Sequence, residues 1–131
     1  MPDSSIDNVF EHGQTDDPMI VEFTLGGAPM MILTAGPHHK LTPAASISVL
    51  TRDQAETDHL WSALVANGGE ESQCGWLVDR FGVSWQIVPE NLPRLLGQPD
   101  RAAGARAQAA MMQMRKIDIA ALEAAAREPA R

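Results

Sequence analysis

This chain of 131 residues is poor in cysteine, which occurs once, at Cys74. No intrachain disulfide can form, so the composition fits a reducing compartment. Long apolar runs are also missing, since no stretch approaches the roughly 20 residues that a membrane-spanning helix needs. Residues 1–7 have neither the basic nor the apolar region of a signal peptide. Together these shortages predict a cytoplasmic protein that does not associate with membranes.

Positive charge is scarce as well. Ten lysines and arginines face 17 aspartates and glutamates, which gives a formal net charge of −7. A chain with this balance and without a basic stripe is not expected to bind nucleic acid. The sequence also lacks the glycine-rich loops that hold nucleotides, dinucleotides or S-adenosylmethionine, because its glycine pairs at 26–27 and 68–69 lie at turns. We therefore expect no cofactor.

What the sequence does contain is a clear β-hairpin over residues 74–89. Two apolar runs flank a short polar turn at 79–82, in which Gly82 is placed to adopt a positive φ. The second run alternates between two faces: Val83, Trp85 and Ile87 on one, Ser84, Gln86 and Val88 on the other. A strand with one apolar and one polar face can separate a core from a site. Alternatively, the polar face meets only water.

Further elements are expected on both sides of the hairpin. Strands are predicted at 4–12, 19–25, 29–34, 44–51 and 70–73, and a helix with an apolar stripe at 53–66. After Pro89 the pattern becomes helical, with a short helix that ends at Gly97 and longer helices capped by Asp100 and Asp118. Gly104 lies inside the second of these helices and is expected to cost it roughly 1 kcal/mol relative to alanine. The order predicts an α+β protein with a βαβββ unit at 44–89.

Several of these segments resemble a known family. The hairpin sequence CGWLVDRFGVSWQIVP is similar to that of PhnB-like proteins, which are catalogued as demethylubiquinone methyltransferase-like. Further segments share the resemblance: 23–27, 35–37, 53–61, 67–71 and 111–119. This family belongs to the vicinal oxygen chelate superfamily, also called glyoxalase/bleomycin-resistance/dioxygenase. The resemblance implies one glyoxalase-type domain over 1–131, built from paired βαβββ modules, with a C-terminal helical extension at 90–131.

The first module, 1–43, departs from this family pattern. In the family, a strand and a helix normally precede the segment that matches residues 2–6, so we expect this module to lack its opening strand and helix. A missing strand leaves an open sheet edge that another chain can cover. The resemblance therefore implies a homodimer, in which strands can be exchanged between the subunits.

The resemblance also bears on metal binding. In the metal-dependent relatives each module supplies two ligands, commonly His and Glu, to one divalent ion. The matching positions here are Ser46 and Gln86, and neither residue type is a good ligand for a divalent metal. We therefore expect no metal site of the family type. The four histidines are expected at the surface: His12 at a strand end, His38 and His39 in a loop, and His59 on a helix.

Strand parity independently predicts a polar pocket. Ser46 and Ser48 share one face of their strand, and Ser84 and Gln86 share one face of theirs. If the two strands lie in one curved sheet, these groups converge, with Trp76 as a further lining residue. Convergent polar groups in a concave and otherwise apolar hollow are typical of a ligand site. The alternative is that a dimer contact buries the same face.

Three functions remain open at this point. The first is a metal-free protein that binds a small molecule in the concave sheet pocket, with unknown catalytic residues. The second is a metal-dependent enzyme of glyoxalase or dioxygenase type whose ligands lie elsewhere, and the third is an inert paralogue kept for dimerisation. Cys74 has no neighbour in sequence that would activate it and is expected to be a small buried hydrophobe. The methionines of the middle helix, Met111, Met112 and Met114, are predicted to serve as packing.

Overall fold

The computed structural model describes residues 1–11, 13 and 17–128. The chain divides into two compact units, Met1–Lys40 and Leu41–Arg131. The expectation for His12 lies outside the described residues, and so do residues 129–131 of the expected C-terminal extension. The identification of the first unit as an incomplete module remains a prediction.

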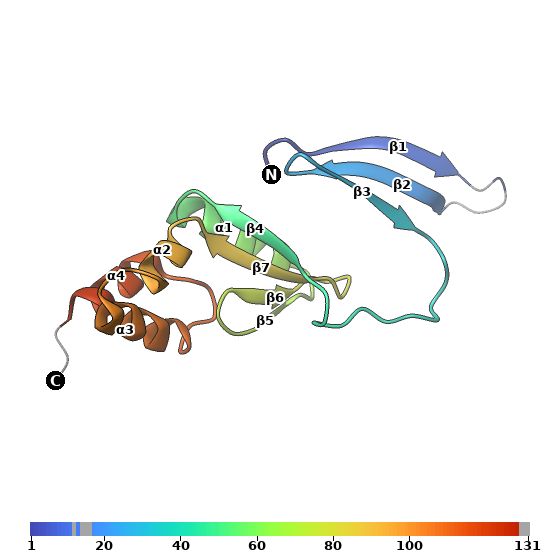
Figure 1. Ribbon diagram of the computed structural model, residues 1–131. Coiled ribbons are helices and arrows are strands. Elements are labelled where there is room, and N and C mark those ends of the chain that lie inside the picture. Colours follow the sequence, from blue (N-terminus) through green and yellow to red (C-terminus); the bar gives the residue numbers. More distant parts are fainter. Residues whose placement is uncertain (12, 14–16, 129–131) are drawn as a thin grey trace. The chain divides into compact units, whose positions relative to one another are not determined.

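The first unit is a three-stranded antiparallel sheet. Its strands are β1 (Ser5–Glu11), β2 (Pro18–Leu25) and β3 (Ala28–Leu33), in that spatial order (Figure 1). The three strands predicted from the sequence are confirmed. One face is built from two apolar cross-strand rows: Ile6, Phe23 and Met30, then Val9, Val21 and Ile32. On this face Ile6 is 74% and Ile32 is 56% exposed, so much of its apolar surface is open.

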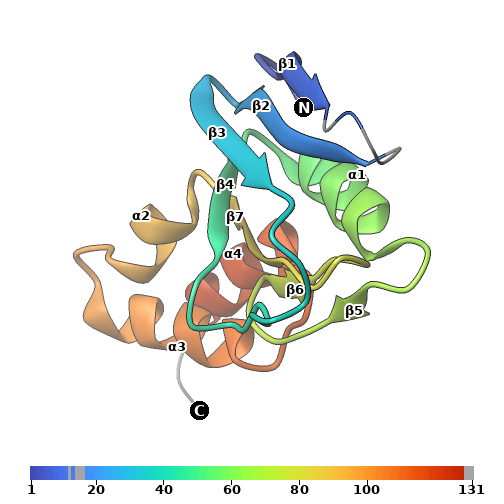
Figure 2. The same ribbon diagram turned by 90° about the vertical axis from the view of Figure 1, so that its right-hand side faces the viewer.

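The second unit contains the predicted βαβββ segment. Its strands are β4 (Ile47–Thr51), β5 (Glu70–Glu71), β6 (Trp76–Val78) and β7 (Ser84–Pro89), and its helix is α1 (Gln54–Val65). The sheet has the order β4-β7-β6-β5, which can be followed in Figures 1 and 2. Strand β4 runs parallel to β7, and the other pairs are antiparallel. The strand expected to begin at residue 44 begins at Ile47, so Ser46 precedes it.

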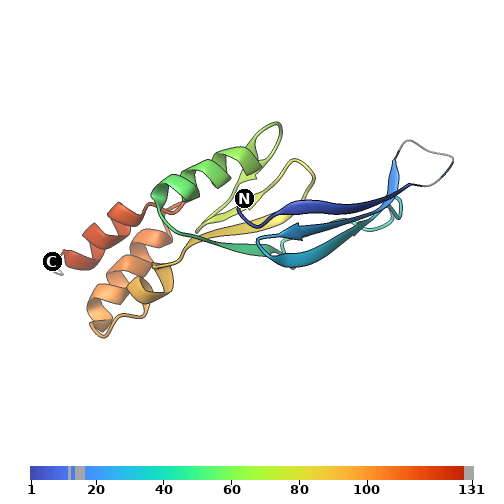
Figure 3. The ribbon, with the colours of Figure 1, turned by 90° about the horizontal axis from the view of Figure 1, so that it is seen from above.

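Helix α1 covers one face of this sheet, as Figure 3 shows. Asp53 caps its N-terminus by accepting a hydrogen bond from the Glu56 backbone N–H at 2.8 Å, as its side chain and position predict. The face of α1 that meets the sheet carries the predicted apolar stripe, in which Leu60 and Trp61 are buried. The Trp61 indole donates to Glu71 Oε1 at 2.6 Å and so joins the helix to the edge strand.

A buried pair of hydroxyls holds the start of α1 to the end of β4. Thr51 and Thr57 are both fully buried, and their Oγ1 atoms lie 2.7 Å apart. Thr57 also donates to the Asp53 carbonyl at 2.9 Å, so Thr51 must be the donor within the pair. Both hydroxyls are therefore satisfied inside the core.

The C-terminal part forms three helices at one end of the sheet (Figure 3). They are α2 (Leu92–Leu96), α3 (Arg101–Met111) and α4 (Ile119–Arg127), and Asp100 and Asp118 cap the last two as predicted. Leu92, Ile117 and Leu122 form their core, and Met111 and Met114 pack against it. Helix α3 ends at Met111 rather than running through Met114, and Met112 is 56% exposed.

The packing of α3 on α2 depends on a glycine. Gly104 is buried in α3, and a Cβ atom placed there would lie 2.6 Å from the Leu96 carbonyl oxygen. The glycine therefore permits close packing of α3 on α2, a role that helix propensity alone did not reveal.

No helix in the described part of the chain is long and apolar enough to cross a membrane.

Candidate functional site

The open face of the second sheet, opposite α1, carries all the residues that strand parity predicted for a pocket. Ser48 of β4 and Trp76 of β6 both pair with Gln86 of β7, one from each side. Residues paired across a ladder project to the same face, and so do alternate residues of one strand, which adds Ser84. The opposite face of the sheet, which lies under α1, carries the alternate residues of β7, of which Trp85 and Ile87 are buried. These residues therefore share one face of the sheet, and their role as a ligand pocket stays a prediction.

Ser46 joins this group through its side chain. The Gln86 amide nitrogen Nε2 donates to Ser46 Oγ at 2.9 Å, and both residues are half-buried. This bond links β7 to the segment just ahead of β4 and fixes the orientation of the Gln86 amide. The amide oxygen Oε1 then remains able to accept a hydrogen bond from another molecule.

Ser84 is the unusual member of the group. The residue is only 3% exposed, yet its Oγ has no hydrogen-bond partner in the part of the chain that the structure describes. A buried hydroxyl without a partner costs on the order of 1–3 kcal/mol, because it has given up water and gained nothing. Such a group at a candidate site points to a partner from outside the described residues.

The rest of this face combines apolar area with little charge. Trp76 and Val88 are half-buried, Ser48 is exposed, and Leu50 is 65% exposed. The charged side chain nearest to this group in the ladder is Glu70 on β5, which pairs with Val78 at the edge of the sheet. The open face therefore has an uncharged centre with apolar residues beside it.

This donor set does not fit the divalent metal site of the metal-dependent relatives. The two matching positions, Ser46 and Gln86, are neutral, and they are hydrogen-bonded to each other. Neutral hydroxyl and amide groups are weak ligands compared with imidazole or carboxylate. Among the described residues, no three or more His, Cys, Asp or Glu side chains are grouped so that they could hold a metal ion.

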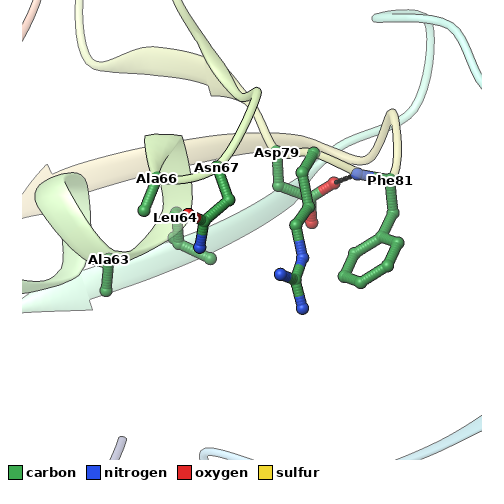
Figure 4. A pocket seen from close by; sticks show the side chains of 7 residues that line it. Ala63, Leu64, Ala66, Asn67, Asp79 and Phe81 are labelled. Carbon is green, nitrogen blue, oxygen red and sulfur yellow. Dashed lines mark hydrogen bonds between the residues drawn. The ribbon is translucent and has the colours of Figure 1, made fainter.

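A separate hollow lies between the end of α1 and the hairpin turn (Figure 4). It has a volume of about 270 Å³ and is lined by Ala63, Leu64, Ala66, Asn67, Asp79, Arg80 and Phe81. The Arg80 guanidinium lies over the Phe81 ring, 4.6 Å from its centroid. Sequence reasoning did not predict this hollow, because two segments separated in sequence form it.

Asp79 makes the turn beside this hollow rigid. Its Oδ1 accepts from the backbone N–H groups of Phe81 and Val83 at 2.9 and 3.0 Å, and its Oδ2 accepts from the Trp85 indole at 2.9 Å. Gly82 has a φ of +88°, as the turn prediction required. These bonds fix the start of β7, and with it the position of Ser84.

The remaining sequence candidates lie elsewhere. His38, His39 and His59 are exposed, as predicted. Cys74 is half-buried rather than fully buried, and its φ of +56° places it in a turn ahead of β6. Its Sγ lies 3.7 Å from Met112 Sδ, a contact between segments far apart in sequence.

Comparison with known proteins identifies the family of this chain. The profile of a family described as 3-demethylubiquinone-9 3-methyltransferase matches residues 1–88. The chain belongs to this PhnB-like family. A search among curated proteins found no match.

Two solved structures share the fold of this chain. A PhnB protein from Bacillus cereus is 24% identical with a TM-score of 0.62, over 67% of this chain and 81% of that one. Protein PA1353 from Pseudomonas aeruginosa is 23% identical with a TM-score of 0.55, over 66% and 78%. At these identities the likeness shows the fold alone, which is α+β of glyoxalase type, as the sequence resemblance predicted.

Proposed function

We propose that this PhnB-like protein binds a small organic molecule on the open face of β4, β7 and β6, without a resident metal ion. The observation that carries the proposal is the buried Ser84 hydroxyl without a partner, on the same face as the Gln86–Ser46 pair. Because Ser84 Oγ is covered in the free protein, a ligand would supply the missing hydrogen bond after the side chains above it move aside. Trp76 and Leu50 would supply apolar contact on either side.

The proposal includes no catalytic residue. The groups on this face are hydroxyls and an amide, which bind and orient a ligand but are poor general acids or bases near neutral pH. The glyoxalase-type fold supports membership of the vicinal oxygen chelate superfamily, but a fold shared by many chemistries does not supply an activity. The family's descriptive name is likewise no evidence of methyl transfer by this chain.

We also propose that the protein is a homodimer. The support comes from the first unit, whose apolar rows leave Ile6 and Ile32 largely exposed. A sheet with an apolar face needs a second layer to cover it, and exposed apolar patches of this kind mark interaction surfaces. Light scattering at micromolar concentration should give twice the chain mass of 14.1 kDa. A monomer mass would refute this part of the proposal, including strand exchange.

The single Cys74 supports a reducing compartment, so the cytoplasm is the expected location. The acidic balance supports the expectation that neither nucleic acid nor a membrane is a partner.

Two measurements test the binding proposal against its alternatives. Elemental analysis of the purified protein should find no stoichiometric divalent metal, whereas one ion per chain would favour the metal-dependent enzyme. A thermal-shift screen of small molecules should find compounds that raise the melting temperature of the wild-type protein but act less on a Gln86→Leu variant. If no compound raises it, the inert dimerising paralogue becomes the better explanation.

A further inference from the structure

We infer that the part of the ligand that lies on this face is flat and uncharged and carries a hydrogen-bond donor next to an acceptor, as a carboxamide does. The inference rests on the proposed function and adds the chemical class of the ligand. It follows from three observations about the open face: its charge, the orientation of one amide, and the position of one indole.

The first observation is the absence of charge at the centre of this face. The side chains that β4, β6 and β7 project there are serine, glutamine, tryptophan or aliphatic. Glu70, at the edge of the sheet, is exposed to solvent. An ionised ligand group brought against this surface would lose hydration without gaining a counter-charge, which is strongly unfavourable. A neutral polar group loses much less and can recover the loss through hydrogen bonds.

The second observation is the orientation of the Gln86 amide. Its Nε2 donates one hydrogen to Ser46 Oγ, which leaves the second N–H as a donor and Oε1 as an acceptor. A ligand that satisfies both must present an acceptor and a donor side by side, which is the pattern of another amide. Ser84 Oγ, two residues earlier on the same face, is a third group in need of a partner.

The third observation is the place of Trp76. It pairs directly with Gln86 across the antiparallel ladder of β6 and β7. Side chains paired in this way have Cβ atoms about 4.5–5.5 Å apart. A ring attached to a group bound at Gln86 can therefore lie over the indole, and aromatic contacts of this kind favour flat ligands.

The test uses three probes of matched size and different charge: benzamide, benzoate and benzylamine. Binding to the uniformly ¹⁵N-labelled full chain is followed by NMR through the Gln86 side-chain amide and the Trp76 indole signals, which are assigned with Gln86→Glu and Trp76→Phe. Benzamide should shift both signals with an affinity at least about tenfold above that of either charged probe, a difference of about 1.4 kcal/mol.

A charge variant makes the test sharper. Gln86→Glu places an anion at the centre of the face, so benzylamine should become the strongest binder through ion pairing. Gln108→Glu is the matched control, because Gln108 is exposed on α3, a helix that packs on α2 and α4. It should leave the preference for benzamide unchanged, which separates a local effect from that of net charge.

The outcomes distinguish a failure of this inference from a failure of the binding proposal. If benzoate or benzylamine shifts the Gln86 and Trp76 signals of the wild-type protein as strongly as benzamide, the inference is wrong, while the binding proposal stands. If no probe shifts either signal, the binding proposal fails and the inference fails with it. The wild-type comparison alone decides between these results, even if Gln86→Glu does not fold.

Discussion

Replacing Gly104 with alanine should destabilise this protein, although alanine is the better helix former. Gly104 is the fourth residue of the 11-residue helix α3 and is buried where that helix packs on α2. A Cβ atom at this position would lie 2.6 Å from the Leu96 carbonyl oxygen and 3.5 Å from the Leu96 carbonyl carbon. The obstacle is backbone, which cannot rotate away as a side chain can, so one helix must move.

Two opposed contributions determine how much Gly104→Ala changes the free energy of unfolding. Alanine in place of glycine inside a helix gains roughly 1 kcal/mol from propensity. Forcing an extra carbon into a packed core costs roughly 1–3 kcal/mol. The upper part of that range applies here because Leu92 anchors α2 in the core, which limits its movement. We therefore expect a net loss of about 1–2 kcal/mol, or a melting temperature lower by roughly 3–10 °C.

Thermal unfolding followed by circular dichroism measures this change, and Ala105→Gly is the matched control. Ala105 is the next residue of α3 and is exposed, so its replacement reports propensity without packing and should cost about 1 kcal/mol. Both variants should melt below the wild-type protein, although their chemical changes are opposite. If Gly104→Ala instead raises the melting temperature by as much as Ala105→Gly lowers it, the close approach of the helices does not limit stability and the reasoning is wrong.

Three further changes test the core and the surface. Thr57→Val leaves the buried Thr51 hydroxyl without an acceptor and should cost about 1–3 kcal/mol in urea unfolding, more than Thr51→Val; equal costs would contradict the donor assignment. Trp85→Phe removes an indole hydrogen bond and should lower the urea midpoint by the equivalent of about 1 kcal/mol. The hydrogen bond from Lys116 holds the pKa of Asp58 below its ordinary value of 3.8, so its stabilisation is present above that pH and is lost as the pH falls through the lower folded-state value. Asp58→Asn should therefore lower the midpoint at pH 7 but not in strong acid, and a constant difference would refute this.

The parts of this fold that local sequence determines were predicted well. Asp53, Asp100 and Asp118 cap their helices because a short acidic side chain can reach the nearest free N–H groups whatever surrounds it. The hairpin turn is likewise set by Gly82 and its neighbours. The gathering of Ser48 and Gln86 on one face needed only a strand period of two and adjacent strands.

The features that sequence reasoning missed depend on distances between elements. Gln54 is an example: its amide donates to the Ile117 carbonyl at 2.9 Å and accepts from the Ile119 backbone N–H at 2.8 Å, so it joins the starts of α1 and α4. Nothing near Gln54 in sequence indicates those partners. The role of Gly104 and the exposure of Met112 were missed for the same reason, since each depends on how one helix lies against another.

Ser84 was predicted in one respect and missed in another, and it allows a decisive test of the candidate site. Strand parity placed its side chain on the polar face, but only the structure shows that its hydroxyl is buried without a partner in the described part of the chain. If that hydroxyl serves a ligand, the free protein carries its desolvation cost, so Ser84→Ala should raise the melting temperature of the free protein and weaken benzamide binding together. A serine with a purely structural partner would give the opposite pattern, a lower melting temperature with unchanged binding. That result would remove the observation on which the proposed function depends.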